Sequence, residues 1–400
     1  MPPVMSRRKP VSAMIVMGTR PEVTKLGPVA LELLRHPNQF RVILVGTGQH
    51  RDLVPQHLGL FHLNLDHDLK VMRPGQSLSG IAARTIERMG ASLEKAPPDV
   101  MIVEGDTNAV FAAGLAAFYR RVPVAHVEAG LRSGDIYDPF PEEMNRRLVS
   151  ALAALHFAPT RQAKENLLKE NVPAASVFVT GNTAIDALLF ASRQEVSEPA
   201  VPVEWLRGRR LVLVTAHRRE SWGAGIREIC RALAELARMS PDIVIIYAVH
   251  PNPQVRGVAE KVLAGRDRVH LISPPNYEQF VDLMKRSYLI LTDSGGIQEE
   301  APALGKPVLV MRKTTERIEG IAAGNAELVG TDRKTIVARA SALLSDRRRY
   351  SAMARVRNPY GDGKAAARIR KALAYHFGLT RSRPPDFTGA QGRPARYGAK

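Results

Sequence analysis

The sequence contains a single cysteine, few aromatic residues and no apolar run long enough to cross a bilayer. Cys230 excludes an internal disulfide, and its apolar neighbours predict a buried structural thiol rather than a nucleophile. The longest apolar stretches, such as residues 109–118, are too short for a transmembrane helix. The apolar run 11–17 follows three basic residues but is too short for a signal peptide, so we interpret it as the first strand of a cytoplasmic protein.

Acidic residues are outnumbered by basic ones, 39 against 57, which gives a net charge of +18. Much of this excess lies in the two ends of the chain, at residues 7–9 and beyond residue 379. The sequence lacks a basic motif interleaved with aromatic residues, which many nucleic-acid-binding proteins carry. We therefore expect no nucleic-acid partner and no membrane insertion, and the remaining positive charge suits an anionic substrate.

Apolar, β-branched runs alternate with segments of helical period along most of the chain. This alternation predicts an α/β fold with two doubly wound, Rossmann-like domains that face each other across a cleft. The expected strands are 11–17, 41–46, 99–103, 122–126, 155–157 and 177–180 in the first domain, and 211–215, 243–249, 269–272, 288–291 and 307–311 in the second. The length of 400 residues also favours two domains.

The domain boundaries follow from breaks in this alternation and from composition. We expect a flexible basic N-terminus over 1–10, an N-terminal Rossmann-like domain over 11–190 and a linker over 191–210. A nucleotide-binding Rossmann-like domain should follow over 211–358. The chain should end with a C-terminal helix over 359–378, which could cross back to the first domain, and a flexible basic tail over 379–400.

The segment 293–302, with the sequence DSGGIQEEAP, is the most informative motif. It lies between two apolar runs and predicts a glycine turn that opens a helix at the carboxyl edge of a parallel sheet. Backbone N–H groups at such a turn bind phosphate, and Glu300 one turn later could accept hydrogen bonds from sugar hydroxyls. The alternative is an ordinary helix cap with surface glutamates.

Other charged residues follow the ends of the predicted strands. Arg20 and Lys25, after the first strand, could neutralise a diphosphate. Asp106 is either a helix N-cap or a cleft carboxylate, and Glu128 stands where packing requires no acid. Glu142 opens a helix, where dipole compensation would also explain it. Three carboxylates in one cleft suit general acid/base chemistry.

In the second half, His217 follows a strand and is flanked by Arg218, so it could protonate or polarise a leaving diphosphate. His250 follows the next strand and is a weaker candidate. Arg317, after the strand that follows the diglycine helix, would face the same cleft. A surface histidine among solvated charges is the alternative for His217.

Seven motifs occur in order: GTRPE at 18–22, GDT at 105–107, HVEAGLR at 126–132, PEE at 141–143, HRRE at 217–220, the 293–302 segment and TTER at 314–317. Together they resemble the non-hydrolysing UDP-N-acetylglucosamine 2-epimerases, from about Val11 to Arg370. The resemblance implies a homodimer with a glycosyltransferase-B-like fold that interconverts UDP-GlcNAc and UDP-ManNAc without metal or other cofactor. It implies elimination of UDP to 2-acetamidoglucal, followed by re-addition, in the biosynthesis of cell-surface polysaccharide.

The resemblance also implies roles for individual residues. Asp106, Glu128, Glu142 and His217 would be catalytic, the carboxylates as acid or base in an order left open, and Glu142 could instead orient Arg146 or a sugar hydroxyl. The substrate would be bound by Arg20, Lys25, Arg146, Phe280 (against uracil, with Pro275 nearby), Ser294, Gly295, Gly296, Glu300 and Arg317. Gln49 and His250 are candidate regulatory residues, although Asp52 departs from the family's usual Gln-His-Arg-Gln segment.

Ser221, Ala248 and Ile318 also depart from the family pattern, in ways that affect loop shape more than chemistry. The closest alternative is an epimerase of a modified sugar, such as a UDP-diacetamido-uronic acid. A glycosyltransferase would need fewer carboxylates at the sugar end of the donor, and a non-catalytic UDP-sugar sensor would leave its ligand intact.

Overall fold

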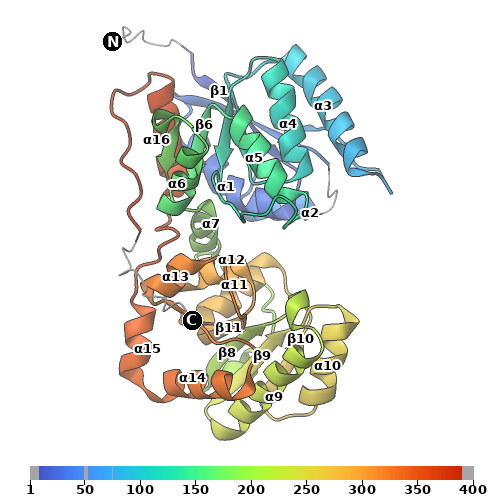
Figure 1. Ribbon diagram of the computed structural model, residues 1–400, viewed down its shortest axis with the longest axis vertical. Coiled ribbons are helices and arrows are strands. Elements are labelled where there is room, and N and C mark those ends of the chain that lie inside the picture. Colours follow the sequence, from blue (N-terminus) through green and yellow to red (C-terminus); the bar gives the residue numbers. More distant parts are fainter. Residues whose placement is uncertain (1–8, 49–52, 74, 390–400) are drawn as a thin grey trace. The chain divides into compact units, whose positions relative to one another are not determined.

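The computed structural model describes residues 9–48, 53–73 and 75–389 and divides the chain into two compact units (Figure 1). Unit 1 combines the chain up to Ala187 with the returning segment Gly361–Thr388, and unit 2 contains Leu188–Tyr360. The C-terminal helix α16 (Ala365–His376) belongs to unit 1, where it packs against α1 (Arg20–Leu34). The sequence predicted this helix but did not decide to which domain it belongs, and its contacts with α1 now assign it to unit 1.

The sheet of unit 1 has seven strands in the order β3-β2-β1-β4-β5-β6-β7, and all its pairs are parallel. These strands are β1 (Val11–Met17), β2 (Phe40–Gly46), β3 (His67–Asp68), β4 (Val100–Glu104), β5 (Val124–Val127), β6 (Leu155–Ala158) and β7 (Val177–Val179). The central strands are buried throughout, as expected for a sheet with helices on both faces.

The helices of unit 1 connect successive parallel strands. They are α1, α2 (Leu53–Leu60), α3 (Leu78–Lys95), α4 (Asn108–Tyr119), α5 (Glu142–Leu152) and α6 (Arg161–Lys169). Helix α7 (Thr183–Ala191) follows β7 and includes the boundary between the units at Ala187, and α16 lies in the returning segment of unit 1. The helices α3, α4 and α5 are neighbours (Figure 1). Hydroxyl groups of Ser77, Thr107 and Thr160 accept backbone N–H groups and so begin α3, α4 and α6.

Unit 2 contains a six-stranded parallel sheet in the order β10-β9-β8-β11-β12-β13. Its strands are β8 (Arg210–Thr215), β9 (Ile243–Ala248), β10 (Val269–Ile272), β11 (Ser287–Thr292), β12 (Val308–Val310) and β13 (Ala326–Leu328). Its helices are α8 (Val203–Leu206), α9 (Ala224–Met239), α10 (Pro253–Leu263), α11 (Tyr277–Arg286), α12 (Gly295–Glu300), α13 (Ile318–Ala323), α14 (Arg333–Ser345) and α15 (Arg347–Ala354).

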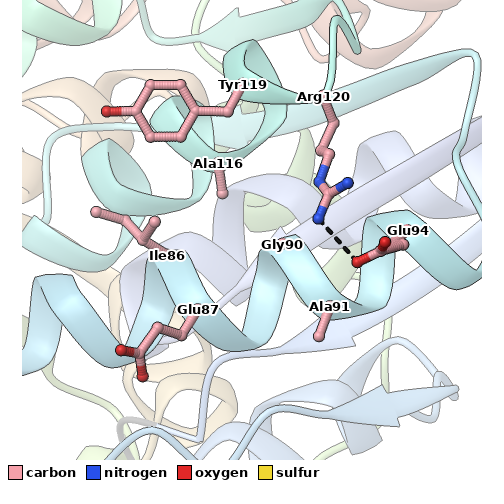
Figure 2. Close-up of a pocket in the computed structure, with 8 residues that line it drawn as sticks. All are labelled: Ile86, Glu87, Gly90, Ala91, Glu94, Ala116, Tyr119 and Arg120. Atoms are coloured by element: carbon pink, nitrogen blue, oxygen red, sulfur yellow. Dashed lines mark hydrogen bonds and ion pairs between the residues drawn. The ribbon is translucent and has the colours of Figure 1, made fainter.

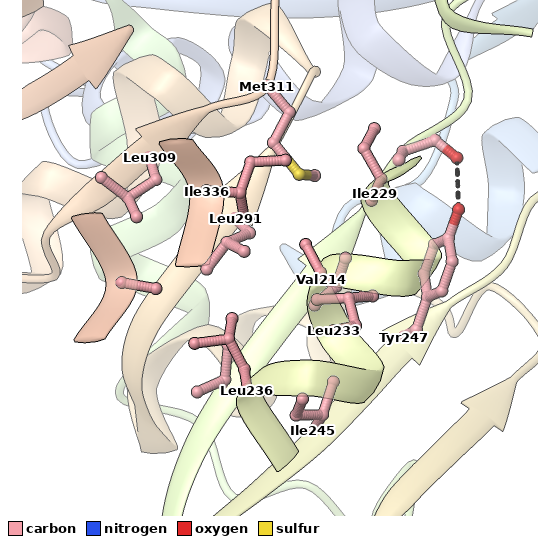
Figure 3. Packing of buried hydrophobic residues seen from close by; sticks show 14 of the residues in the cluster. Val214, Ile229, Leu233, Leu236, Ile245, Tyr247, Leu291, Leu309, Met311 and Ile336 are labelled. Atoms are coloured by element: carbon pink, nitrogen blue, oxygen red, sulfur yellow. Dashed lines mark hydrogen bonds between the residues drawn. The ribbon is translucent and has the colours of Figure 1, made fainter. Parts of the chain in front are cut away.

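The core of unit 2 packs the apolar faces of α9 and α14 against its sheet (Figure 3). Its one large polar side chain is satisfied, because the hydroxyl of the fully buried Tyr247 donates to the carbonyl oxygen of Ala216 at 2.8 Å. That bond also anchors the backbone immediately after β8, next to His217.

The expected α/β class with doubly wound parallel sheets is confirmed, and every expected strand is present within two residues. The short edge strands β3 and β13 were missed, because neither forms the buried apolar run that marks the other strands: both residues of β3 are exposed, and β13 has one buried residue.

The segment that follows α16 differs from the expected flexible tail, as far as residue 389. Asp386 accepts the backbone N–H of Val179 at 3.0 Å and pairs with Lys164 at 2.6 Å, and the N–H of Phe387 donates to the carbonyl of Val179 at 2.7 Å. Arg383 lies over the ring of Phe178. These contacts cover the edge strand β7, whose backbone groups need partners.

Candidate active site

Both sheets contain a point where the strand order reverses: between β1 and β4 in unit 1, and between β8 and β11 in unit 2. Loops on either side of such a point leave toward opposite faces of the sheet and open a crevice at the carboxyl ends of the strands. Four of the predicted site residues follow these strands: Arg20 after β1, Asp106 after β4, His217 after β8 and Ser294 after β11. Each unit therefore presents its own group of charged side chains.

Lys25 is the centre of the group in unit 1. Its Nζ donates to Glu104 Oε1 at 2.9 Å and to Glu128 Oε1 at 2.6 Å. Glu104 ends β4, and Glu128 follows β5 with a positive φ of 63°, a conformation that non-glycine residues rarely adopt. The two carboxylates raise the pKa of Lys25 above its usual value, although burial opposes them. Lys25, expected to neutralise a diphosphate, is thus paired with Glu128 and with Glu104, which was not among the expected site residues.

Asp106 follows β4 by two residues and is not the N-cap of α4, because Thr107 fills that position. Its carboxylate accepts Arg146 Nε at 2.7 Å, and its carbonyl accepts the side-chain amide of Asn145 at 2.9 Å. Burial raises the pKa of Asp106, and Arg146 opposes this rise. A carboxyl group with a raised pKa and a cationic neighbour suits proton transfer.

Glu142 lies half-buried in the first turn of α5, and its neighbour Glu143 is fully buried. Glu143, not Glu142, pairs with Arg146, at 2.9 Å from Nη1, and also accepts the backbone N–H of Ser133 at 3.0 Å. We had considered that Glu142 could orient Arg146, but the residue that contacts Arg146 is Glu143. Glu142 stays a candidate acid or base.

Arg20 is exposed at the start of α1, and the turn before it is stabilised from inside. The buried carboxylate of Glu22 accepts the backbone N–H groups of Gly18 at 2.5 Å and Thr19 at 3.2 Å. Burial raises the pKa of Glu22. This contact shapes the turn between β1 and α1 and leaves the guanidinium of Arg20 available to an anion.

In unit 2, His217 lies against Asp293, with 3.3 Å between Nδ1 and Oδ1. Asp293 also accepts the backbone N–H groups of His217 at 2.6 Å and Arg218 at 2.8 Å, and it is fully buried. Burial lowers the pKa of His217, while Asp293 acts in the opposite direction. The ring of His250 stacks near His217, with 5.7 Å between the centroids.

The diglycine turn follows β11 as expected, and Ser294 is the N-cap of α12. Gly295 is buried beneath the guanidinium of Arg317, and a Cβ there would lie 3.0 Å from Arg317 Cζ. Gly296 is exposed and has open space around it. Arg317 Nε donates to Glu299 at 2.9 Å. A side chain at 295 would therefore crowd the guanidinium of Arg317, whereas Gly296 leaves the helix N-terminus accessible.

The remaining predicted residues lie nearby in unit 2 or outside the described residues. Phe280 is half-buried on α11, one turn after Tyr277, whose pKa is raised by burial and by the charge of Glu300. Gln49 lies outside the described residues. Prediction missed Glu104 and Asp293 as site residues, although both stand at strand ends inside motifs that we had identified.

A separate hollow of about 510 Å³ lies between α3 and α4, with the ion pair between Glu94 and Arg120 at its rim (Figure 2). Its lining consists of small, apolar and exposed charged side chains from these two helices. None of the residues around Lys25 and Arg146 lines this hollow, so it is separate from the candidate site. In the described parts of the chain, no His, Cys, Asp and Glu side chains gather as a metal site. No helix there is both long and apolar enough to span a bilayer.

Comparison with known proteins agrees with this arrangement over nearly the whole chain. Residues 32–374 match the family model of UDP-N-acetylglucosamine 2-epimerase. The UDP-N-acetylglucosamine 2-epimerase of Escherichia coli K12 is 49% identical over 370 residues, covering 91% of this chain and 98% of the relative. The enzyme of that name from Bacillus subtilis is 46% identical, covering 95% and 100%.

The solved structures show the same likeness. UDP-GlcNAc 2-epimerase from Neisseria meningitidis, bound to UDP-GlcNAc, has a TM-score of 0.78 and 44% identity and covers 91% of this chain and 99% of its own. Its fold class is that of the two parallel-sheet units described above. Ordered motifs, strand-end carboxylates and a match across both units lead to one conclusion: the chain belongs to the UDP-N-acetylglucosamine 2-epimerase family.

Proposed function

We propose that this protein interconverts UDP-GlcNAc and its C-2 epimer UDP-ManNAc. The observation that carries the proposal is the group of carboxylates around Lys25 and Arg146 at the carboxyl ends of β4 and β5, in a chain of this family. The relatives named above act on UDP-N-acetylglucosamine according to their names, and one of them was solved with that ligand.

The chemistry explains why such a group is needed. The C-2 hydrogen of the sugar is not adjacent to a carbonyl, so direct removal of the proton is difficult. When the anomeric C–O bond breaks, UDP leaves with the electron pair, positive charge develops at C-1, and the C-2 proton becomes more acidic. A carboxylate accepts that proton as the C-1–C-2 double bond forms, which gives 2-acetamidoglucal. Re-addition of UDP with proton delivery to the opposite face completes the epimerisation.

In this mechanism unit 1 supplies the proton-transfer groups. Asp106, Glu128 and Glu142 are the candidate acid and base residues. Burial supports Asp106, because it raises the pKa of this carboxyl group and so makes the carboxylate a better proton acceptor. Arg146 holds Asp106 in place, and Lys25 does so for Glu128.

The departing diphosphate requires positive charge and hydrogen-bond donors. We assign this role to Arg20, His217 and the N-terminus of α12 at Ser294, Gly295 and Gly296. Arg317 would bind the nucleotide or diphosphate, Glu300 the ribose and Phe280 the uracil. These assignments follow the family motifs residue by residue.

Proton NMR of the protein with UDP-GlcNAc in heavy water tests the proposal. We expect deuterium at C-2 as UDP-ManNAc appears, and Asp106→Asn should slow exchange by orders of magnitude. Intact, undeuterated UDP-GlcNAc after prolonged incubation would refute the proposal. A diacetamido-uronic acid substrate would then be assayed in the same way.

We further propose that the protein is a cytoplasmic homodimer, as the family resemblance implies. The buried thiol of Cys230, for which the chain offers no disulfide partner, suits a reducing compartment. Sedimentation equilibrium and cell fractionation test the two statements. A monomer across micromolar concentrations, or recovery outside the cytoplasmic fraction, would contradict them.

A further inference from the structure

Lys25 contacts two carboxylates at once, the buried Glu104 and the partly buried Glu128, and only Glu128 was an expected site residue. Its Nζ lies 2.9 Å from Glu104 Oε1 and 2.6 Å from Glu128 Oε1. The side chain of Glu104 is 3% exposed, that of Glu128 is 12% exposed, and that of Lys25 is 21% exposed. Glu104 is thus the inner member of the three and is too enclosed to contact a substrate.

The charges around this array leave a negative excess. Two carboxylates share one ammonium group, and the buried Glu22 on α1 lies near enough to raise the pKa of Glu104 further. Asp106 also faces the array, but it has its own cation in Arg146 from α5. The second oxygen of Glu128 accepts the side-chain amide of Asn182 at 3.3 Å. Lys25 is therefore the cation that both Glu104 and Glu128 contact.

Sharing a cation has a direct consequence for proton transfer. A carboxylate that alone pairs with a buried ammonium is held in its charged form and accepts a proton poorly. If it did accept one, the partly buried ammonium would be left without a counter-ion, which is unfavourable. A second carboxylate on the same lysine removes both obstacles, because it repels the first and keeps the ammonium paired.

We propose that Glu104 is a positioning residue that shares Lys25 with Glu128 and thereby keeps Glu128 able to take up and release a proton. This proposal rests on the function given above, in which Glu128 is one of the acid/base residues. Glu104 acts through Lys25 and not on the sugar. The three residues form one titrating unit, in which the protonation of either carboxylate changes that of the other.

The direction of the pKa of Glu104 agrees with this arrangement. Burial raises it well above its usual range, Lys25 opposes that rise, and the charge of Glu128 adds to it. The location agrees as well. Glu104 is the last residue of β4, one residue before Gly105, which has a φ of 76° and leads directly to Asp106.

Glu104→Gln tests the proposal, because it removes the charge and keeps the shape and an oxygen for Lys25. Loss of the charge of Glu104 leaves Glu128 as the one carboxylate paired with Lys25, which favours the charged form of Glu128. We expect the limb of the kcat/KM pH profile that belongs to Glu128 to move to lower pH by about one unit or more. We also expect kcat to fall about tenfold at neutral pH, with KM changed less. Glu104→Asp keeps the negative charge, so its kcat/KM pH profile should lie closer to that of the wild-type protein than the profile of Glu104→Gln does.

The matched control is Glu32→Gln. Glu32 is also partly buried and forms an ion pair with Arg370 at 2.8 Å, near the far end of α1. This variant loses the same charge from the same unit and should leave the pH profile in place. An equal shift in both variants would show a general charge effect and overturn the proposal.

A second readout does not depend on turnover. In protein labelled at the glutamate carboxyl carbon, with signals assigned by Glu104→Gln and Glu128→Gln, the two carboxyls of the wild-type protein should titrate with common midpoints. The Glu128 midpoint should fall in Glu104→Gln. Independent single-step curves, or an unmoved Glu128 midpoint, would overturn the proposal even if the protein is an active epimerase.

The two proposals can therefore fail separately. Common midpoints in a wild-type protein that leaves UDP-GlcNAc unchanged would support the coupling and refute the assigned reaction. If Glu104→Gln does not fold, the wild-type titration curves still decide the coupling.

Discussion

The carboxylate of Asp293 holds both the ring and the backbone of His217. It lies 3.3 Å from Nδ1 of the imidazole and accepts the backbone N–H of His217 at 2.6 Å. Asp293 directly follows β11, and His217 follows β8, so two adjacent strands bring together residues that are 76 positions apart. With Nδ1 directed to Asp293, the opposite nitrogen of the ring is the one available to a substrate.

Asp293→Asn should lower the pKa of His217 further. Burial already lowers this pKa, and the negative charge that opposes burial would be lost. Proton–carbon correlation spectra of the imidazole across pH measure the change. His270 is the internal reference. It lies on the edge strand β10, where its ring stacks on that of Trp205 with 3.7 Å between the centroids, and its pKa should not change. An unchanged His217 midpoint would show that Asp293 does not control this histidine.

Arg146→Met should raise the pKa of Asp106 because it removes the cation that opposes burial. If Asp106 reacts as a base, the acidic limb of the kcat/KM profile will move to higher pH, by roughly one unit or more. Arg147→Met is the control, since Arg147 pairs with Glu143 and not with Asp106. A profile that shifts equally in both variants would argue against a specific effect of Arg146.

Gly295→Ala should weaken the binding of UDP by about tenfold, or ~1.4 kcal/mol. The added Cβ would approach Arg317 Cζ to 3.0 Å and displace the guanidinium that we assign to the nucleotide. Titration calorimetry measures the affinity. Gly257→Ala, on α10 with open space around the site, is the control and should bind UDP normally. Wild-type affinity in Gly295→Ala would remove Arg317 from the binding site.

A chain that ends at Thr380 should be less stable and more prone to self-association than the full chain. It loses the contacts of Asp386 and Phe387 with Val179 and exposes the edge of β7. We expect the Tm to fall by several degrees, since one charge-assisted hydrogen bond contributes about 1.5–3 kcal/mol. Differential scanning calorimetry and light scattering measure the two effects.

The comparison for this truncation is a chain that ends at Gly389, which keeps every one of these contacts. It should match the full chain in Tm and in scattering. If the two truncations behave alike, the segment from Arg381 to Thr388 does not protect the sheet edge.

The sequence by itself determined the elements and the residues at their ends. Buried parallel strands leave continuous apolar runs, and amphipathic helices repeat with a period of 3.6, so both are visible locally. Val11–Met17 and Val269–Ile272 have the expected bounds for this reason. The ordered motifs likewise pointed to Asp106, Glu128 and the diglycine turn, which the structure places after the ends of β4, β5 and β11, because short loops keep such residues close in sequence to recognisable strand ends.

Only the tertiary structure decided which of these residues become partners. Glu104 reaches Lys25, and Asp293 reaches His217, because β4 lies beside β1 and β11 beside β8, an order that no local pattern encodes. The choice of Glu143 over Glu142 for Arg146 depends on the rotation of α5 about its axis. Strand order and helix rotation are set by packing across the whole unit, and these long-range contacts establish the charge balance of the site.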